Sequence, residues 1–379
     1  MMHQALIMDS EGSMQLKMIS TPKTQSHDVL VRPLWAGICG TDVQIMRRMR
    51  TEHGPILGHE GVGEVIERGD CVSHVALNEV VTFLPTDPTG SPDILGHTVP
   101  GLFQHRLHVP ASPLGKQLLM TYPLAIPLQD GPLLEPLATA IYAFETCTSH
   151  AVPKSVAIIG AGSLGLLLAI VARLHGVEQI FLLHHQRSRL DWACRRSIVT
   201  PQEAVLMQEN LGAEMDERTH GEGVEVIFLC TPRNAALQAL STALRLCASD
   251  GCIDMIGGIT KGDTINQLSG IDLGHIRAKN HCGYPTPAYT WYGTTSLGKA
   301  IKLTGHRGIH QRHMLAAMDL MQRMPAVFRA IISHVVSLAG AATLFEAWRH
   351  TTTRRYQQQE CVKVLVDCTR VDQYIQVIS

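Results

Sequence analysis

The chain has 379 residues, of which 45% are hydrophobic and 17% are charged, a balance typical of a globular protein with a substantial core. The formal net charge is −1, so no basic excess indicates a nucleic-acid partner. No segment approaches the roughly 18 consecutive apolar residues of a membrane span, and the first residues are typical of a strand rather than a signal peptide. Disordered, membrane-spanning and polyanion-binding classes are therefore poor matches, and the length favours two domains or one large α/β unit.

The ten cysteines indicate a reducing compartment. None forms a Cys-x-x-Cys pair, and most lie in apolar runs. A disulfide framework would be unusual in a chain of this length, so we expect reduced thiols and a cytoplasmic location. Nine of the ten are expected to be small buried hydrophobic residues. Cys39 is the exception, because it lies among other chemically active residues.

Short β-like runs dominate residues 1–130, and Val29–Arg32, Gly61–Glu67 and Glu79–Leu84 are typical examples. Between 86 and 100, prolines and glycines predict a loop. From about Leu133 the pattern changes to helical stretches, beginning with Leu137–Cys147, that alternate with buried strands. The strands expected there are Ser155–Gly160, Gln179–Leu183, Val224–Cys230 and Gly251–Ile256. This alternation predicts a parallel sheet covered by helices.

The last part of the chain returns to a mixed pattern. A helix is expected over Gln311–Met324, followed by strands over Ile331–Val336 and Cys361–Asp367. We expect both strands to pair with the N-terminal unit.

A glycine-rich turn follows the first buried strand of the second unit. Its sequence, Gly160-Ala-Gly162-Ser163-Leu164-Gly165, matches G-x-G-x-x-G and opens an apolar helix over Leu164–Leu174. The first glycine would permit the tight turn, the second the approach of a pyrophosphate, and the third close packing of helix on strand. Its place after a strand and before a helix favours a dinucleotide site over a turn that serves packing alone.

The end of the next strand distinguishes NAD from NADP. NAD-preferring sites carry an acid about 20 residues past the glycines, whereas here His184 takes that position and Arg187 and Arg189 follow. The missing acid and the nearby positive charge favour a 2′-phosphate, and hence NADP slightly over NAD. The alternative is that the two arginines only form a solvated helix start.

Three separate segments supply candidate metal ligands: Cys39, His59 with Glu60, and Glu135. Cysteine, histidine and glutamate are competent zinc ligands, and a catalytic zinc uses three protein ligands with one position open. The hydroxyl of Thr41 follows the thiol by two residues and is well placed to relay a proton from a metal-bound alcohol. Zinc acidifies such an alcohol, which then releases hydride to nicotinamide.

With these residues in place, the chain resembles the zinc-dependent medium-chain dehydrogenases of the alcohol, sorbitol and threonine dehydrogenase kind. The resemblance covers nearly the whole chain. It rests on G-I-C-G-T-D at 37–42, G-H-E-G-V-G-E-V at 58–65, a G-L-F-Q strand at Gly101–Gln104, L-E-P-L-A at 134–138 and A-I-I-G-A-G-S-L-G at 157–165. It implies an α/β fold class with a GroES-like, β-rich catalytic domain over 1–139, a Rossmann doubly wound parallel sheet over 140–288, and a C-terminal return to the catalytic domain over 289–379.

The resemblance also implies roles for individual residues. Cys39, His59 and Glu135 correspond to the catalytic zinc ligands, and Glu60 to the acid that ligates zinc or exchanges with water. Thr41 corresponds to the relay hydroxyl. The positions that correspond to cofactor contacts are Thr139, Gly160, Gly162, Ser163, Leu164, Gly165, His184, Arg187 and Arg189. A homodimer or homotetramer is implied as well.

Two departures from the family pattern matter. Many relatives carry four closely spaced cysteines that bind a structural zinc, but Cys71 is the only cysteine between Cys39 and Cys147. We therefore expect one catalytic zinc and no structural one. The segment 284–313 is also unusual, and its His306 and Arg307 either reach substrate or a neighbouring chain or, as the simpler interpretation, belong to an exposed polar loop.

The substrate is expected to be a small polar alcohol, with no nucleic acid or membrane as partner. The basic stretch 47–53 suits a polyhydroxylated or anionic molecule, or else forms a solvated charged face. Glu135 in place of a thiolate resembles polyol and threonine dehydrogenases, so we favour a secondary alcohol or ketone on a sugar, polyol or cyclitol. The alternatives are a zinc-free quinone or enoyl reductase of the same superfamily and a non-catalytic nucleotide-binding protein.

Overall fold

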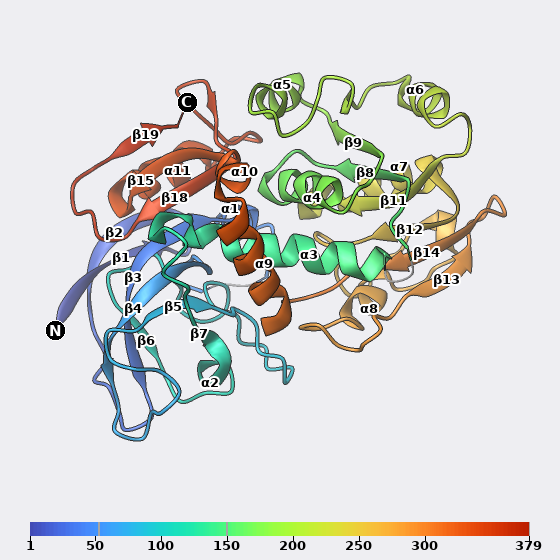
Figure 1. Ribbon diagram of the computed structural model, residues 1–379. Coiled ribbons are helices and arrows are strands. Elements are labelled where there is room, and N and C mark those ends of the chain that lie inside the picture. Colours follow the sequence, from blue (N-terminus) through green and yellow to red (C-terminus); the bar gives the residue numbers. More distant parts are fainter. Residues whose placement is uncertain (52–53, 149–150, 379) are drawn as a thin grey trace. The chain divides into compact units, whose positions relative to one another are not determined.

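The computed structural model describes residues 1–51, 54–148 and 151–378 (Figure 1). The chain divides into two compact units, Met1–Pro136 with His310–Ser379, and Leu137–Ile309. The second unit continues past the expected boundary at 288, because β14 (Ala300–Thr304) pairs in parallel with β12 (Cys247–Asp254) of the same sheet. The return to the first unit therefore begins at the helix that follows, not at 289.

The first unit is rich in strands. Among the described residues, eight strands form its main sheet in the order β19-β15-β18-β3-β4-β5-β7, with β6 paired to β3, and β1 and β2 form a separate hairpin. The strands are β1 Met2–Met8, β2 Met14–Ser20, β3 Val29–Ile38, β4 Glu60–Arg68, β5 Val80–Phe83, β6 Leu107–Val109, β7 Leu119–Thr121, β15 Ile332–Ser337, β16 Arg355–Tyr356, β17 Gln359–Glu360, β18 Lys363–Asp367 and β19 Ile375–Val377. The helices are α1 Gly40–Met46, α2 Gly115–Leu118, η1 Leu128–Leu133, α9 Gln311–Arg323, α10 Pro325–Arg329 and α11 Leu338–Trp348.

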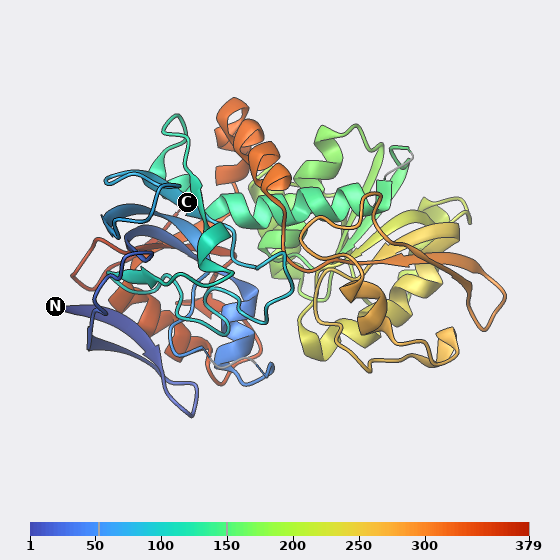
Figure 2. The ribbon, with the colours of Figure 1, turned by 90° about the horizontal axis from the view of Figure 1, so that it is seen from below.

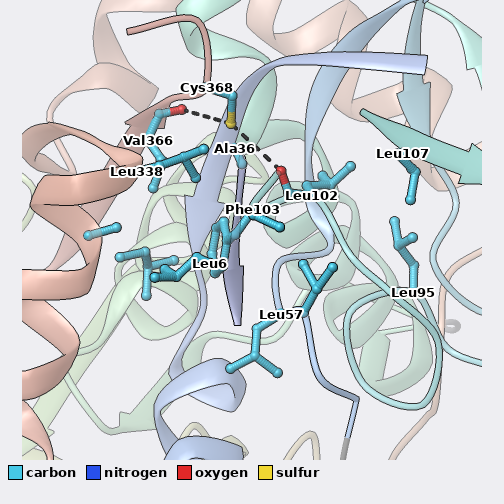
Figure 3. Close-up of a cluster of buried hydrophobic side chains, with 14 of the residues drawn as sticks. Leu6, Ala36, Leu57, Leu95, Leu102, Phe103, Leu107, Leu338, Val366 and Cys368 are labelled. Carbon is cyan, nitrogen blue, oxygen red and sulfur yellow. Dashed lines mark hydrogen bonds between the residues drawn. The ribbon is translucent and has the colours of Figure 1, made fainter. Parts of the chain in front are cut away.

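The C-terminal strands pair with the N-terminal unit, as the sequence predicts. β18 runs antiparallel to β3 and parallel to β15, so the last strands (red in Figure 1) complete a sheet that begins with the blue ones. The core beside this sheet contains the buried side chains drawn in Figure 3, among them Leu6, Leu57 and Phe103. Cys368 of this core lies with its Sγ 3.7 Å from the carbonyl oxygens of both Leu102 and Val366.

The second unit is a doubly wound sheet. Its strand order is β10-β9-β8-β11-β12-β14-β13, and all pairs are parallel except β13 with β14. The strands are β8 Ser155–Ile159, β9 Gln179–His184, β10 Ala204–Leu206, β11 Val224–Leu229, β12 Cys247–Asp254, β13 Trp291–Thr294 and β14 Ala300–Thr304. The helices are α3 Leu134–Thr148, which begins in the first unit, α4 Ser163–Leu174, α5 Arg187–Arg195, α6 Leu211–Arg218, η2 Arg233–Ala235, α7 Ala236–Leu246, η3 Asn266–Leu268 and α8 Leu273–Ala278.

Burial explains why these strands are parallel. All five residues of β8 are buried, as expected of a strand that helices cover on both faces. Helix α4 packs on β8 and β9, and α7 packs on β11 and β12. Numbered in chain order from β8, the seven strands of this sheet have the spatial order 3-2-1-4-5-7-6, whose reversal between β8 and β11 is where such sheets bind nucleotides. None of the described helices combines the length and apolar character needed to span a bilayer.

Two sequence expectations about strands and loops are wrong. Gly101–Gln104 is not a strand: only Gln104 forms an isolated bridge, to Ala5, because Gly101 packs against the backbone of Gly58 and the chain turns there. The segment 284–313 is not an exposed loop, because it contains β13 and β14. Their hairpin (orange in Figures 1 and 2) forms one edge of the parallel sheet.

The cysteines differ in their exposure. All ten are free, but Cys71 is exposed, and Cys147, Cys194 and Cys230 are half-buried, so the expectation of nine buried thiols is too general. Cys71 is exposed because it follows Asp70 in the polar turn after β4 instead of lying on a strand. Among the buried thiols, Cys252 lies with its Sγ 3.4 Å from that of Cys147.

A buried carboxyl at the end of β12 makes stability depend on pH. Asp254 is fully buried and accepts a hydrogen bond from Thr146 at 2.9 Å. Burial raises the pKa of Asp254 to about 7, although the Thr146 hydroxyl and the Arg277 charge act in the opposite direction. An unfolded aspartate has a pKa of about 3.9, so the folded state holds the proton more tightly and loses stability as pH rises between about 4 and 7.

We expect Asp254→Asn to remove this dependence. The amide stays neutral and retains an oxygen for Thr146, so at pH 8 the variant should be more stable than the unchanged protein by on the order of 1–3 kcal/mol. At pH 5 the difference should be much smaller. Urea unfolding of both proteins at the two pH values measures it, and a stability difference that is the same at both would contradict the assignment.

Candidate metal centre and nucleotide-binding turn

The first element of the candidate centre is the start of α1. Cys39 is the residue before the helix, and its Sγ accepts a hydrogen bond from the Thr41 backbone N–H at 3.4 Å. Asp42 Oδ2 in turn accepts the Cys39 N–H at 2.8 Å. This reciprocal pair of bonds fixes the thiol at the end of β3, where the strand turns into the helix.

His59 and Asp42 form the second element. The chain reaches His59 through Gly58, whose φ of +95° and whose contact with the Phe103 ring leave no room for a side chain. Asp42 Oδ1 accepts the Gly58 N–H at 3.1 Å and lies 3.6 Å from His59 Nδ1. Asp42 thus has one oxygen on the Cys39 segment and the other on the His59 segment, and it joins them.

Glu60 and Lys363 form the third element. Glu60 is the first residue of β4 and is 2% exposed, and its Oε2 accepts a hydrogen bond from the ammonium of Lys363, which is fully buried. Arg354 lies within electrostatic range of Cys39 and Glu60, so two cationic side chains flank the acid.

The structure brings Cys39, His59 and Glu60 together. One potential ligand atom from each lies within 4.8 Å of the other two, the one such group of three or more found among the described residues. Glu135, at the start of α3, is not part of this group.

This donor set suits a divalent metal ion. It combines a thiol, an imidazole and a carboxyl group, and the buried His59 Nδ1 makes no hydrogen bond, although the Asp42 carboxylate lies near it. Burial lowers the pKa of His59, but Asp42 and Cys39 outweigh it and raise the pKa well above its ordinary value. The same negative groups favour a cation at this position.

The nucleotide-binding turn lies in the second unit, between β8 and α4. Gly160 has φ of +124°, and a Cβ there would lie 2.3 Å from the Cys230 carbonyl oxygen at the end of β11. A Cβ on Gly165 would lie 1.9 Å from the Gly160 carbonyl oxygen. Gly162 precedes the helix, and Ser163 and Leu164 begin it, so the turn lies at the N-terminus of α4, the end of a helix that favours an anion.

The candidate cofactor residues at and after the end of β9 differ in their exposure and hydrogen bonding. His184 Nδ1 accepts the Gln186 N–H at 3.0 Å, which leaves the proton on Nε2, where it is a donor. Arg187 is the exposed first residue of α5, whereas Arg189 is buried. The interpretation of both arginines as a solvated helix start therefore does not hold for Arg189.

The remaining sequence candidates lie in varied surroundings. Thr139 is one helical turn after Glu135 on α3, and both are half-buried between buried neighbours. His306 is 2% exposed, and its ring centroid lies 4.2 Å from that of Tyr142, so the expected exposed loop is wrong at this residue. A polar residue between a short strand and a helix gave no signal of such burial.

The basic stretch 47–53 is partly structural. Arg47 Nε donates to the Trp348 carbonyl at 3.0 Å, and its Nη2 donates to the Thr353 carbonyl at 3.4 Å. Arg47 therefore fastens the end of α1 to α11 and the segment after it. Residues 52 and 53 of the stretch lie outside the described residues.

Sequence reasoning gave no role to Asp42, Lys363, Arg354 or His97, whose ring centroid lies 4.7 Å from that of His59. Asp42 carried a usable signal, because it follows Cys39, the residue just before the helix, by three positions, and an acid at that spacing is the pattern of a capping box. Lys363 and Arg354 carried none, since they reach the site from the C-terminal part of the chain.

The chain is similar to several known dehydrogenases. Residues 25–117 match the family described as the alcohol dehydrogenase GroES-like domain. The chain is 27% identical over 293 residues to an L-threonine 3-dehydrogenase of Bacillus licheniformis, covering 69% of this chain and 81% of that protein. It is 24% identical over 270 residues to a sorbitol dehydrogenase of Arabidopsis thaliana, covering 65% and 71%. Over most of its length the chain is therefore similar to medium-chain dehydrogenases/reductases.

A solved structure shares the fold along almost the whole length of the chain. A solved structure from Sinorhizobium meliloti 1021, described as a zinc-binding dehydrogenase and bound to NADP, superposes with a TM-score of 0.72. The identity is 22%, and the match covers 97% of this chain and 100% of the other. The GroES-like unit and the doubly wound unit predicted from the sequence are therefore both confirmed.

Proposed function

We propose that this protein is a zinc-dependent oxidoreductase that transfers a hydride between NAD(P) and a secondary alcohol or ketone of a sugar, polyol or cyclitol. The observation that carries the proposal is the group of Cys39, His59 and Glu60, in which Cys39 is half-buried and the other two are buried. It lies in one unit of a chain whose other unit has a glycine-rich turn before a helix. The relatives named as threonine and sorbitol dehydrogenases support a polar alcohol as substrate.

The reaction is balanced by the cofactor. A secondary alcohol gives hydride from its carbinol carbon to the nicotinamide and a proton from its hydroxyl to the protein, leaving a ketone; reduction runs in reverse. When bound, zinc supplies Lewis acidity that lowers the pKa of the alcohol. Cys39 and His59 would hold it, with Glu60 beside them and Glu135 as the further ligand that the family resemblance implies.

The other residues hold the substrates and move the proton. Thr41 follows Cys39 by two residues, and its backbone N–H donates to the Cys39 thiol; its hydroxyl takes the proton from the alcohol. Asp42 orients His59. In the second unit, the turn from Gly160 to Gly165 holds the pyrophosphate, and Thr139 contacts the nicotinamide.

Metal content and turnover test the proposal together. Protein purified without added metal should contain about one zinc per chain and reduce NADP or NAD with members of a polyol panel. About two zinc ions would indicate a structural site as well. No zinc, with activity on quinones or enoyl compounds, would favour the zinc-free reductases, and cofactor binding without any turnover would favour a non-catalytic role.

Arg187→Ala tests the cofactor preference. Arg187 is exposed at the first position of α5, next to His184 where an acid would bind the ribose of NAD. We expect the substitution to raise the KM for NADP roughly 10-fold, the loss of about 1.4 kcal/mol of interaction, with little change for NAD. Equal effects on both cofactors would show that the charge does not bind the 2′-phosphate.

Arg195→Ala on the same helix is a matched control for general charge loss.

The predicted cytoplasmic location and homodimer or homotetramer remain part of the proposal. Light scattering on the purified protein measures the oligomeric state.

A further inference from the structure

Lys363 is a charged residue in a fully buried position, which is unusual for a lysine. It is the first residue of β18 and is fully buried, and Glu60 is the one hydrogen-bond partner of its ammonium among the described residues. Removing two charges from water costs several kcal/mol per ion, so a buried ion pair is weak evidence for a role in stability. This pair includes a member of the candidate metal centre, which suggests a role there.

The sheet is built to let the two side chains meet. β3 lies between β4, which carries Glu60, and β18, which carries Lys363, and Gly37 of β3 is paired directly with Glu60. A Cβ on Gly37 would lie 2.6 Å from Glu60 Oε2 and 2.6 Å from Lys363 Nζ. The ion pair therefore crosses β3 at Gly37, and only glycine leaves room for it there.

The carboxylate of Glu60 accepts a hydrogen bond from the Lys363 ammonium, lies within electrostatic range of Arg354, and is near whatever metal ion Cys39 and His59 hold. We propose that Lys363 is a positioning residue that retains Glu60 beside the metal centre as a reserve group, so that Glu60 is not a permanent ligand and the substrate keeps its coordination position. The inference rests on the proposed metal centre. Its physical basis is that an oxygen that accepts a hydrogen bond from an ammonium is a weaker metal ligand than a free carboxylate.

This proposal makes a prediction that structural damage would not produce. In Lys363→Met the buried Glu60 carboxylate has lost its ammonium, so it should bind the metal instead. Metal affinity should rise on the order of 10-fold, the scale on which outer groups tune metal sites, while kcat falls because a protein ligand occupies the substrate's position. If Lys363 served folding alone, the substitution would lower both the metal affinity and kcat.

Cobalt(II) in place of zinc provides a readout other than activity. The visible absorption of the Lys363→Met protein should change because a carboxylate takes the coordination position left for substrate, and Lys363→Arg, which keeps the charge, should resemble the unchanged protein. The double variant Lys363→Met/Glu60→Gln should recover the original spectrum. Glu60→Gln alone should leave the spectrum unchanged, which tests the proposal even if Lys363→Met does not fold.

The outcomes separate the two levels of inference. If the unchanged protein binds no cobalt and Cys39→Ser makes no difference, the proposed metal centre fails. If cobalt binds but Lys363→Met has an unchanged or lower affinity, or Glu60→Gln alone alters the spectrum, the metal centre stands and the role of Lys363 is wrong.

Discussion

Cys39→Ser should lose the bound metal and nearly all turnover while it still folds and binds the nucleotide. A serine hydroxyl stays protonated near neutral pH and is a poor ligand, whereas a thiolate is among the strongest for zinc. We expect metal affinity to fall by more than the roughly 10–100-fold that outer-group changes cause. Loss of about 4 kcal/mol of Lewis-acid stabilisation would lower turnover by about 10³-fold.

The substitution is a clean test because serine can take over the structural role of the thiol. Cys39 Sγ accepts the Thr41 N–H at the start of α1, and serine is a preferred residue at such a position. The nucleotide-binding turn belongs to the other unit of the chain, so cofactor affinity should be unchanged.

Cys71→Ser is the matched control, because this thiol is exposed and lies in the same unit. It should keep both metal and turnover. Zinc content by mass spectrometry, thermal unfolding and fluorescence of bound NADPH distinguish the outcomes. Wild-type metal content and turnover in Cys39→Ser would remove the thiolate from the centre.

The parts of the fold that the sequence predicts are those set by short-range patterns. Continuous apolar runs such as Val156–Ile159 specify buried parallel strands, and the spacing of Gly160, Gly162 and Gly165 specifies the turn after them. His59 and Glu60 are adjacent in sequence, so their nearness to each other needs no tertiary information. The position of Cys39 beside them does need tertiary information, and we expected that position only because of the family resemblance.

What the sequence does not predict depends on pairings between distant segments. Lys363 reaches Glu60 only because β18 and β4 both pair with β3, over a sequence separation of 303 residues. His306 is polar and follows a short strand, so local pattern favours an exposed loop, yet packing against Tyr142 buries it. Gly101–Gln104 has the composition of a strand, but close contact with the backbone of Gly58 turns the chain away.

Gly165→Ala should strongly weaken nucleotide binding although it adds a single methyl group. Gly165 is the third residue of α4, and a Cβ there would lie 1.9 Å from the Gly160 carbonyl oxygen, with the Gly160 carbonyl carbon at 3.1 Å and the Ile158 side chain at 3.2 Å. The obstacle is backbone, which cannot rotate aside as a side chain would. The first turn of α4 must therefore move away from β8, and the helix N-terminus, which we propose binds the pyrophosphate, moves with it.

The expected loss of NADPH affinity is on the order of 10²-fold, which corresponds to about 2.7 kcal/mol. Gly212→Ala is the matched control: it lies in the first turn of α6, where a Cβ would meet nothing within 4 Å, and helix propensity favours alanine there. Fluorescence titration with NADPH measures both variants, and zinc content should be unchanged in each. Because the control makes the same chemical change at a helix start without a collision, equal NADPH affinity in the two variants would show that the Gly160–Gly165 contact does not hold the turn in its binding conformation.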